Sequence, residues 1–297
     1  MSRSATWPFA VSLILLLGVD APVGDAFAAS PRRVEFEGAA QPLGGLQERL
    51  ARERGEVPKD IPGDQLQAFL AKPDGDGPFA AVVALHGCDG LREATVQRAS
   101  DRLVSWGYVA LLVDSFTTRN IDHACTPEKY AAVEGNILKR TFDAYGALLF
   151  VARQPFVDPG RVAVVGASQG GMVALSVAEE RTFELFINPS NLAFRAAVAL
   201  YPPCSAAGAR PSLPTLILVG ELDDWTSAKD CVRTIARWGN AGPSVQLVTY
   251  PGAYHSFDAP SLQPGKMMFG HWLEYNAKAS EDAHHRIRAF LADYLGK

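Results

Sequence analysis

A short segment at residues 161–171 constrains the fold of this chain more than any other. It reads Arg-Val-Ala-Val-Val-Gly-Ala-Ser-Gln-Gly-Gly, and an alanine-rich stretch of helical character follows it at once. A β-branched run that turns through Gly-x-Ser-x-Gly into a helix strains the serine backbone, and side chains two positions to either side would clash. The segment therefore predicts a strand, a sharp turn and a helix, with the Ser168 hydroxyl raised above the edge of a sheet. A glycine-rich turn that only packs a helix against a strand is the alternative interpretation.

A carboxylate and a histidine follow Ser168 in the chain order that this type of turn requires for a catalytic triad. One apolar run, predicted to be a buried strand, leads into Asp223 and Asp224, and another leads into the loop that contains His255. An acid just past the end of a strand can reach a histidine on a neighbouring loop, and we prefer Asp223, with Asp224 as its close competitor. Capping of the following helix is the alternative role for either carboxylate. A lone loop histidine is ordinarily solvated, but the order Ser168, Asp223, His255 favours a catalytic role for it.

The turn after an earlier apolar run predicts an oxyanion hole. Residues 79–85 have the composition of a buried strand, and His86-Gly-Cys-Asp-Gly follows them. A His-Gly turn lets a backbone N–H approach a substrate, so we expect Cys88 to donate one N–H to an oxyanion and Gln169 to donate the other. We expect His86 itself to be a structural hydrogen-bonding residue under the loop.

These segments resemble the dienelactone hydrolase family of the α/β-hydrolase superfamily, over about residues 62–295. The resemblance implies an α/β-hydrolase fold and activity on esters or lactones. The family's named members use a cysteine nucleophile on lactones, whereas this chain has Ser168 at that position, which favours ordinary ester hydrolysis. The matching pieces are Leu85-His-Gly-Cys-Asp-Gly-Leu91, Val113-Asp-Ser-Phe116, Gly166-Ala-Ser-Gln-Gly-Gly171, Tyr201-Pro-Pro-Cys204, Gly220-Glu-Leu-Asp223 and Tyr254-His-Ser-Phe257.

The order of predicted elements indicates an α/β protein with a mainly parallel sheet and helices on both faces. Strands and helices alternate, and right-handed crossovers place the strand ends that precede the triad residues and the oxyanion donors on one edge of the sheet. The expected strands are 65–71, 79–85, 108–114, 161–167, 196–202, 214–220 and 245–250, and the expected helices are 93–106, 128–153, 170–180, 227–238 and 279–295.

The N-terminus has the pattern of a secretory signal peptide at residues 1–28. Arg3 provides the positive region, residues 9–18 the apolar core, and Ala26-Phe-Ala28 the cleavage site. The apolar run is shorter than the roughly 20 residues that span a bilayer, so we expect export to the periplasm or the medium, with no stable membrane insertion after cleavage. Residues 29–63 are predicted to be an N-terminal arm with an edge strand at 33–37 and a short helix at 45–54, and residues 64–297 the hydrolase domain.

Export makes the cysteines informative, because an oxidising compartment favours disulfides. All four cysteines follow the signal, and four cysteines allow three full pairings. We favour a bond between Cys125 and Cys204, which both lie near predicted strand ends and would staple a loop beside the pocket. Four buried thiols are the alternative, and the spacing does not fit a metal site.

The sequence favours an exported serine hydrolase of small or medium esters or lactones. The net charge of −4 over 297 residues and the absence of nucleotide-binding or zinc-binding spacings indicate no nucleic-acid partner, metal or cofactor. An acyltransferase or peptidase on the same triad, and a non-catalytic binding protein on a hydrolase scaffold, remain alternatives, and the oligomeric state stays open. For Arg119 we favour a surface arginine on a loop, and the alternative is that it pairs with a substrate carboxylate, as arginines do in dienelactone-type enzymes. The expected substrate-binding residues are Phe116, Arg119, His123, Tyr201, Trp225, Tyr254 and Phe257.

Overall fold

The computed structural model of the chain describes all residues except 2–29, 127, 130–135, 180–187, 189–190 and 297. Apart from Met1, the predicted signal peptide lies outside the described residues, as does part of the helix expected at 128–153. In the part of the chain that the structure describes, no helix has the length and apolar content needed to cross a bilayer.

The described residues form one eight-stranded sheet in the order β1-β2-β4-β3-β5-β6-β7-β8. The strands from β4 to β8 in that order run parallel, whereas β1 and β2 pair antiparallel at one edge. The carboxyl ends of β3, β5 and β7 therefore meet at one edge of the sheet. The strand bounds are β1 Arg32–Glu37, β2 Gln65–Ala71, β3 Phe79–Leu85, β4 Val109–Asp114, β5 Val157–Ala167, β6 Ala197–Leu200, β7 Thr215–Gly220 and β8 Val245–Tyr250.

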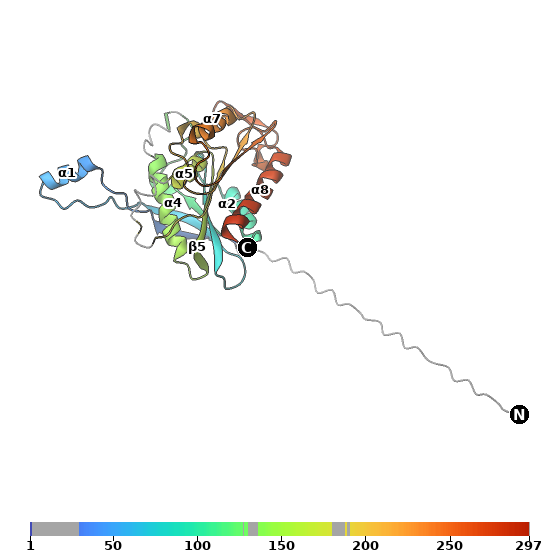
Figure 1. Ribbon diagram of the computed structural model, residues 1–297, viewed down its shortest axis with the longest axis horizontal. Helices are drawn as coiled ribbons and strands as arrows, with labels where there is room; N and C mark the ends of the chain where they lie inside the picture. Colours follow the sequence, from blue (N-terminus) through green and yellow to red (C-terminus); the bar gives the residue numbers. More distant parts are fainter. Residues whose placement is uncertain (2–29, 127, 130–135, 180–187, 189–190, 297) are drawn as a thin grey trace.

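Helices cover both faces of this sheet, as the alternation of elements predicted (Figure 1). Successive residues of β3 show why: Val83 packs into the cluster shared with α4 and α5, while Val82 packs into the cluster shared with α2 and α8. A parallel strand buried on both faces is apolar throughout, which is the composition that made β3 recognisable in the sequence. The helix bounds are α2 Glu93–Ser105, α4 Asn136–Ala152, α5 Gln169–Ala178, α7 Ala228–Trp238 and α8 Ala277–Leu295.

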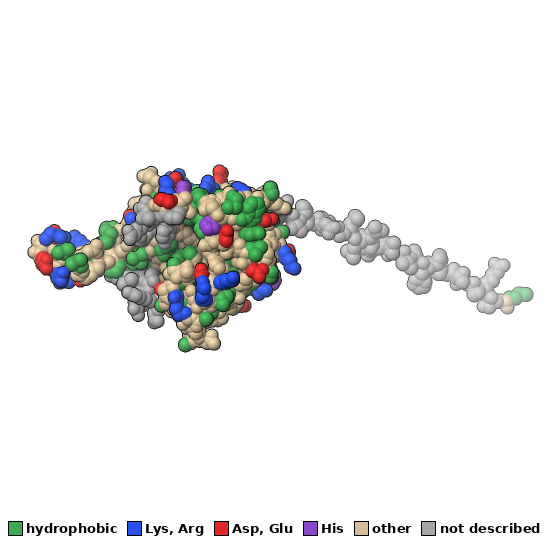
Figure 2. Space-filling model, turned by 90° about the horizontal axis from the view of Figure 1, so that it is seen from above, with side chains coloured by type: hydrophobic (Ala, Val, Ile, Leu, Met, Phe, Trp, Pro, Cys, Tyr) green, Lys and Arg blue, Asp and Glu red, His purple; other side chains and the backbone are tan. Residues whose placement is uncertain are grey.

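An arm between β1 and β2 projects away from the body of the protein and contains α1 (Gly45–Glu53) (Figures 1 and 2). Its two ends lie together, since Gly38 N donates to Asp64 O at 2.9 Å, and a bridge joins Gln41 and Ile61. β1 itself belongs to the sheet, so the projecting part begins after residue 37.

Small elements after β6 and β8 were not predicted. The strand expected at 196–202 ends at Leu200, because Tyr201 has a φ of 38° and Pro202 follows it. A hairpin of two three-residue strands follows β8 at some distance in the chain, and its tip contains Phe269 and Gly270. The additional elements are the 3-10 helices η1 Thr117–Arg119, η2 Cys204–Ala206 and η3 Pro260–Leu262, and the strands β9 Lys266–Met268 and β10 His271–Leu273.

The cysteine pairing corrects the one that we favoured. Cys125 is bonded to Cys88, and Cys204 is bonded to Cys231, with a Cα–Cα distance of 4.9 Å in each bond. The prediction that Cys125 pairs with Cys204 was wrong because proximity to a strand end does not say which strand is the neighbour. The chain around Cys125 returns to the loop after β3, where Ala124 N donates to Cys88 O at 2.7 Å.

Candidate active site

The turn between β5 and α5 has the geometry that its sequence predicted. Ser168 occupies the turn with φ 54° and ψ −117°, a conformation that residues with a β-carbon rarely adopt. A β-carbon at Gly166 would lie 2.0 Å from Gly170 O, and one at Gly170 would lie 2.3 Å from Leu85 O. Both glycines are therefore required by the close approach of backbone on either side of Ser168.

Ser168, His255 and Asp223 form a continuous chain of hydrogen bonds. His255 Nε2 lies 3.0 Å from Ser168 Oγ, and His255 Nδ1 lies 2.8 Å from Asp223 Oδ2. A carboxylate at Nδ1 holds the proton on that nitrogen, so the lone pair of Nε2 faces the serine hydroxyl. The three residues follow β5, β8 and β7, which brings them together from distant parts of the sequence.

The carboxylate of Asp223 is held in place by the residues that follow it. Trp225 N and Thr226 N donate to Asp223 Oδ1 at 3.0 and 2.7 Å, and the Thr226 hydroxyl donates to Asp223 Oδ2 at 2.9 Å. Asp224 points elsewhere: its carboxylate lies 3.1 Å from His271 Nδ1, and its side chain is 58% exposed. The geometry therefore distinguishes the two adjacent carboxylates, because Asp223 contacts His255 whereas Asp224 contacts His271. From the sequence, either could have been the partner of His255.

The two expected oxyanion donors lie on either side of Ser168. Gly87, just before Cys88, is close enough that a β-carbon on it would lie 3.5 Å from Ser168 Cβ. Gln169 is the first residue of α5, where a backbone N–H has no acceptor within its own helix. Cys88, Ser168 and Gln169 line the same cavity. The positive end of the helix dipole adds to the attraction for a negative oxygen at this position.

The cavity beside Ser168 has a volume of about 740 Å³ and is mostly apolar. Trp225 forms part of one wall, with its ring 5.0 Å from His255, 5.8 Å from Phe269 and 4.7 Å from His271, on which it stacks. Glu179 is the one Asp, Glu, Lys or Arg among the described residues that line the cavity. Apolar members of the lining include Ala124, Ile137, Leu138, Met172, Pro203 and Ala206.

Of the residues expected to bind substrate, Trp225 is the one found among the described residues that line this cavity. Phe116, Tyr201 and Phe257 are buried, and the Tyr201 hydroxyl donates to Asp258 at 2.8 Å. The His123 ring lies beside Phe269, 5.4 Å away, and Tyr254 is half-buried on the loop before His255.

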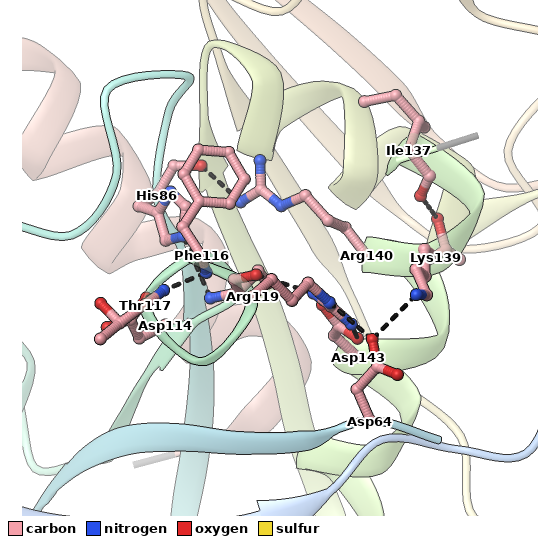
Figure 3. A network of polar contacts seen from close by, with 12 residues as sticks. Asp64, His86, Asp114, Phe116, Thr117, Arg119, Ile137, Lys139, Arg140 and Asp143 are labelled. Carbon is pink, nitrogen blue, oxygen red and sulfur yellow. Dashed lines mark hydrogen bonds and ion pairs between the residues drawn. The ribbon is translucent and has the colours of Figure 1, made fainter. Parts of the chain in front are cut away.

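Arg119 lies in an ion-pair network instead of a substrate site. Its guanidinium donates to both oxygens of Asp143 at 2.7 Å and to Asp64 at 2.6 Å, and its side chain is 12% exposed. Figure 3 shows Arg119 directed toward these two carboxylates, away from Arg140. The expectation that Arg119 pairs with a substrate carboxylate is therefore corrected, because protein carboxylates already take its donors.

Arg140 is a buried residue near the site that sequence reasoning missed. It is 0% exposed, and its two terminal nitrogens each donate at 2.7 Å: Nη1 donates to Gln169 Oε1, and Nη2 donates to His86 O, which Figure 3 shows. Burial, together with the nearby charge of Arg140, lowers the pKa of His86 well below its ordinary value. No motif marks Arg140, because it lies within α4 and reaches its partners across the fold. Thr226, Phe269 and His271 were also missed, because they lie on a loop or in a short hairpin whose path the sequence pattern does not show.

The described residues contain no group of three or more His, Cys, Asp or Glu side chains placed to hold a metal ion.

A comparison with known protein families decides the classification. The sequence profile of the dienelactone hydrolase family matches residues 66–295, which is most of the chain. The chain belongs to the dienelactone hydrolase family. Membership makes it a hydrolase of ester bonds, and the parallel sheet with helices on both faces agrees with the family's α/β-hydrolase fold.

Solved structures share this fold at low sequence identity. A dienelactone hydrolase-like promiscuous phosphotriesterase from metagenomic libraries is 19% identical, with a TM-score of 0.63, 90% of this chain covered and 100% of the other. A protein from Klebsiella pneumoniae subsp. pneumoniae, provisionally described as a dienelactone hydrolase, is 20% identical, with a TM-score of 0.61 and coverages of 89% and 100%. A thermophilic esterase from Thermogutta terrifontis, bound to propionate, is 16% identical, with a TM-score of 0.57 and coverages of 78% and 90%. A comparison with curated protein sequences gives no significant match.

Proposed function

We propose that the protein is an exported serine esterase that cleaves carboxylic esters or lactones through an acyl-enzyme on Ser168. The observation that supports this most directly is the hydrogen-bonded chain from Ser168 through His255 to Asp223, which begins at the cavity and ends in the interior. Such a chain couples a nucleophile to a general base and the base to an orienting carboxylate.

The proposed reaction has two halves. Ser168 Oγ attacks the ester carbonyl carbon while His255 Nε2 takes the hydroxyl proton, and the carbonyl π electrons move to the oxygen of a tetrahedral intermediate. The intermediate collapses, the bond to the leaving alkoxide breaks, and His255 gives the proton to that oxygen. Water then attacks the acyl-enzyme with His255 as base, and collapse releases a carboxylic acid and returns the proton to Ser168.

The negative oxygen of each tetrahedral intermediate is proposed to accept hydrogen bonds from Cys88 N and Gln169 N. The supporting observation is that both residues flank Ser168 at the cavity, one after β3 and one at the start of α5. Removal of one such donor costs about a hundred- to a thousandfold in rate in serine hydrolases.

The lining of the cavity favours esters with an uncharged apolar group over esters that carry a carboxylate. Its described walls contain mainly aliphatic and aromatic side chains, with some neutral polar ones, His271 and one carboxylate, Glu179, whereas the cation of Arg119 is taken by Asp64 and Asp143. A substrate carboxylate would be desolvated there next to a like charge, which is unfavourable.

Export is supported by the cysteines. The described chain contains all four, and each is in a disulfide bond. Disulfides of this kind persist in the periplasm and outside the cell and are rare in a reducing cytosol.

The test is turnover of p-nitrophenyl acetate and butyrate, with and without a fluorophosphonate probe, by the wild-type protein and by Ser168→Ala. We expect the probe and the substitution each to abolish turnover, and Ser105→Ala, an exposed serine on α2, to behave as wild type. Mono-p-nitrophenyl succinate, which adds a carboxylate to a similar acyl chain, should show a kcat/KM at least about tenfold below that of the butyrate. Full activity of Ser168→Ala, or a folded wild-type protein that neither turns over nor is labelled, would contradict the proposal.

A further inference from the structure

Arg140 joins the two segments that carry the expected oxyanion donors. Its Nη1 donates to the side chain of Gln169, at the start of α5, and its Nη2 donates to the carbonyl of His86, two residues before Cys88. Both bonds are 2.7 Å long, and the guanidinium is completely buried. One planar cation therefore spans the gap between the end of β3 and the N-terminus of α5.

We propose that Arg140 is a positioning residue, which fixes the separation of the Cys88 and Gln169 backbone N–H groups and thereby keeps the oxyanion hole formed. This inference rests on the proposed esterase function. The amides themselves bind the oxyanion, and Arg140 acts through the two segments that carry them.

The partners of Arg140 distinguish it from an arginine that only stabilises the fold. Arg119, on the neighbouring loop, is matched by two carboxylates (Figure 3), whereas Arg140 donates to a neutral carbonyl and a neutral amide. Among the described residues, Arg140 Nε has no hydrogen-bond partner. A buried cation without a directly bonded carboxylate is costly for stability, so Arg140 fits a role in the site better than a role in stabilising the fold.

The surroundings hold the guanidinium in one orientation. The Phe116 ring lies 5.2 Å from the Arg140 guanidinium carbon, and the same ring packs edge-on against His86, 4.6 Å away. Below it, His86 Nδ1 contacts Gly87 O at 2.7 Å, and Ser115 N donates to His86 Nε2 at 3.2 Å. The segment that leads to Cys88 is thus fixed on one side by Arg140 and on the other by the disulfide to Cys125.

Geometry explains why another cation would not replace this arginine. Guanidinium presents several N–H groups in one rigid plane, so it can satisfy two acceptors at fixed positions, whereas a lysine ammonium is a single point at the end of a flexible stem. A displacement of about 1 Å in a catalytic group can cost on the order of a hundredfold in rate.

The test compares four variants with wild type: Arg140→Met, Arg140→Lys, Gln169→Met and Arg161→Met. Gln169→Met removes the side-chain acceptor but keeps the backbone N–H. Arg161 is the control, because it also joins distant segments, through Leu295 O and Pro78 O, and pairs with Asp158, but lies near the opposite edge of the sheet. The measurements are kcat and KM for p-nitrophenyl butyrate and the inhibition constant of butylboronic acid. That acid bonds through boron to Ser168 Oγ, and its tetrahedral anion needs the same oxyanion hole.

We expect Arg140→Met to lower kcat by about 10- to 100-fold while KM stays within about twofold of wild type. The inhibition constant of butylboronic acid should rise by the same factor by which kcat falls. Gln169→Met should show the same pattern, Arg140→Lys should recover part of the loss, and Arg161→Met should match wild type. A folded Arg140→Met with wild-type kcat, or a loss of kcat without a matching loss of boronate affinity, would overturn the inference. If Arg140→Met does not fold, the kcat and the boronate affinity of Gln169→Met test the inference in its place. A wild-type protein without turnover or boronate binding would instead contradict the proposed esterase function.

Discussion

Two adjacent carboxylates after β7 each pair with a histidine, and the two pairs differ in every other respect. Asp223 and His255 lie 2.8 Å apart with side chains 0% and 2% exposed, whereas Asp224 and His271 lie 3.1 Å apart with side chains 58% and 27% exposed. The Trp225 ring lies between the two histidine rings, stacked on His271 and tilted against His255.

The difference shows that the contact between imidazole and carboxylate does not by itself define a catalytic pair. Asp223 is also bound by the Trp225 and Thr226 amides and by the Thr226 hydroxyl, so it cannot turn away from His255. An exposed pair such as Asp224 and His271 gains about 1 kcal/mol at most and can be screened by salt. Burial and supporting hydrogen bonds hold the same two residue types in one fixed geometry, which the proposed role of His255 as base requires.

The largest expected effect comes from exchanging the two histidines for alanine. His255→Ala should lower kcat for p-nitrophenyl butyrate by about a millionfold, as loss of the base does in serine hydrolases. His271→Ala should stay within about fivefold in kcat, because the exposed pair contributes little. Comparable losses in the two variants would show that both histidines take part in proton transfer, and circular dichroism of each variant controls for folding.

A smaller but still large effect is expected at the carboxylates. Asp223→Asn should lower kcat by about ten thousandfold, because an amide at this position favours the wrong tautomer of His255. Asp224→Asn should remain within about fivefold of wild type. The two isosteric substitutions are measured in the same esterase assay, and a larger loss for Asp224→Asn would reverse the assignment of the acid.

The smallest expected effect concerns a third histidine, His86, which is buried beside Arg140 without a carboxylate partner. Because burial and Arg140 hold the pKa of His86 well below 6.5, the residue stays neutral in the folded protein while the unfolded chain takes up a proton below about pH 6.5. The free energy of unfolding should therefore fall as the pH is lowered from 6.5. This loss of stability on acidification is the contribution of His86.

Urea unfolding of wild type and His86→Gln at pH 8, 6.5 and 5 measures this contribution. Between pH 6.5 and pH 5 the variant should lose less stability than wild type, because it lacks the buried imidazole that resists protonation. Part of the pH dependence will remain, since burial also lowers the pKa of His284, to about 4. Equal pH dependence in the two proteins would mean that His86 is protonated in the folded state.

The sequence was most informative where the constraint is local. The turn at Ser168 could be predicted because the glycines on either side are needed for contacts made within a few residues and with the adjacent strand. The sheet could be predicted because doubly buried strands such as β3 are apolar throughout. The choice between Asp223 and Asp224 could not be made, because it depends on which way a turn directs two neighbouring side chains.

The sequence was least informative where distant segments meet. Cys125 and Cys204 follow different strands, and their bonds to Cys88 and Cys231 depend on loop paths that composition does not encode. Arg140 contacts Gln169 and His86, 29 and 54 residues away, from inside a helix whose pattern shows only a buried face. The hairpin with Phe269 at its tip has strands of only three residues, which are too short to show an alternation of apolar and polar residues.

The crowding around the turn at Ser168 has a consequence for protein engineering. A β-carbon at Gly166 or Gly170 would lie 2.0 or 2.3 Å from a backbone oxygen. A mutational library should therefore leave both glycines unchanged. Position 168 is different, since serine and cysteine share the same β-carbon and place their reactive atom on the same bond. Exchanging Ser168 for cysteine therefore leaves the backbone contacts that require the two glycines as they are.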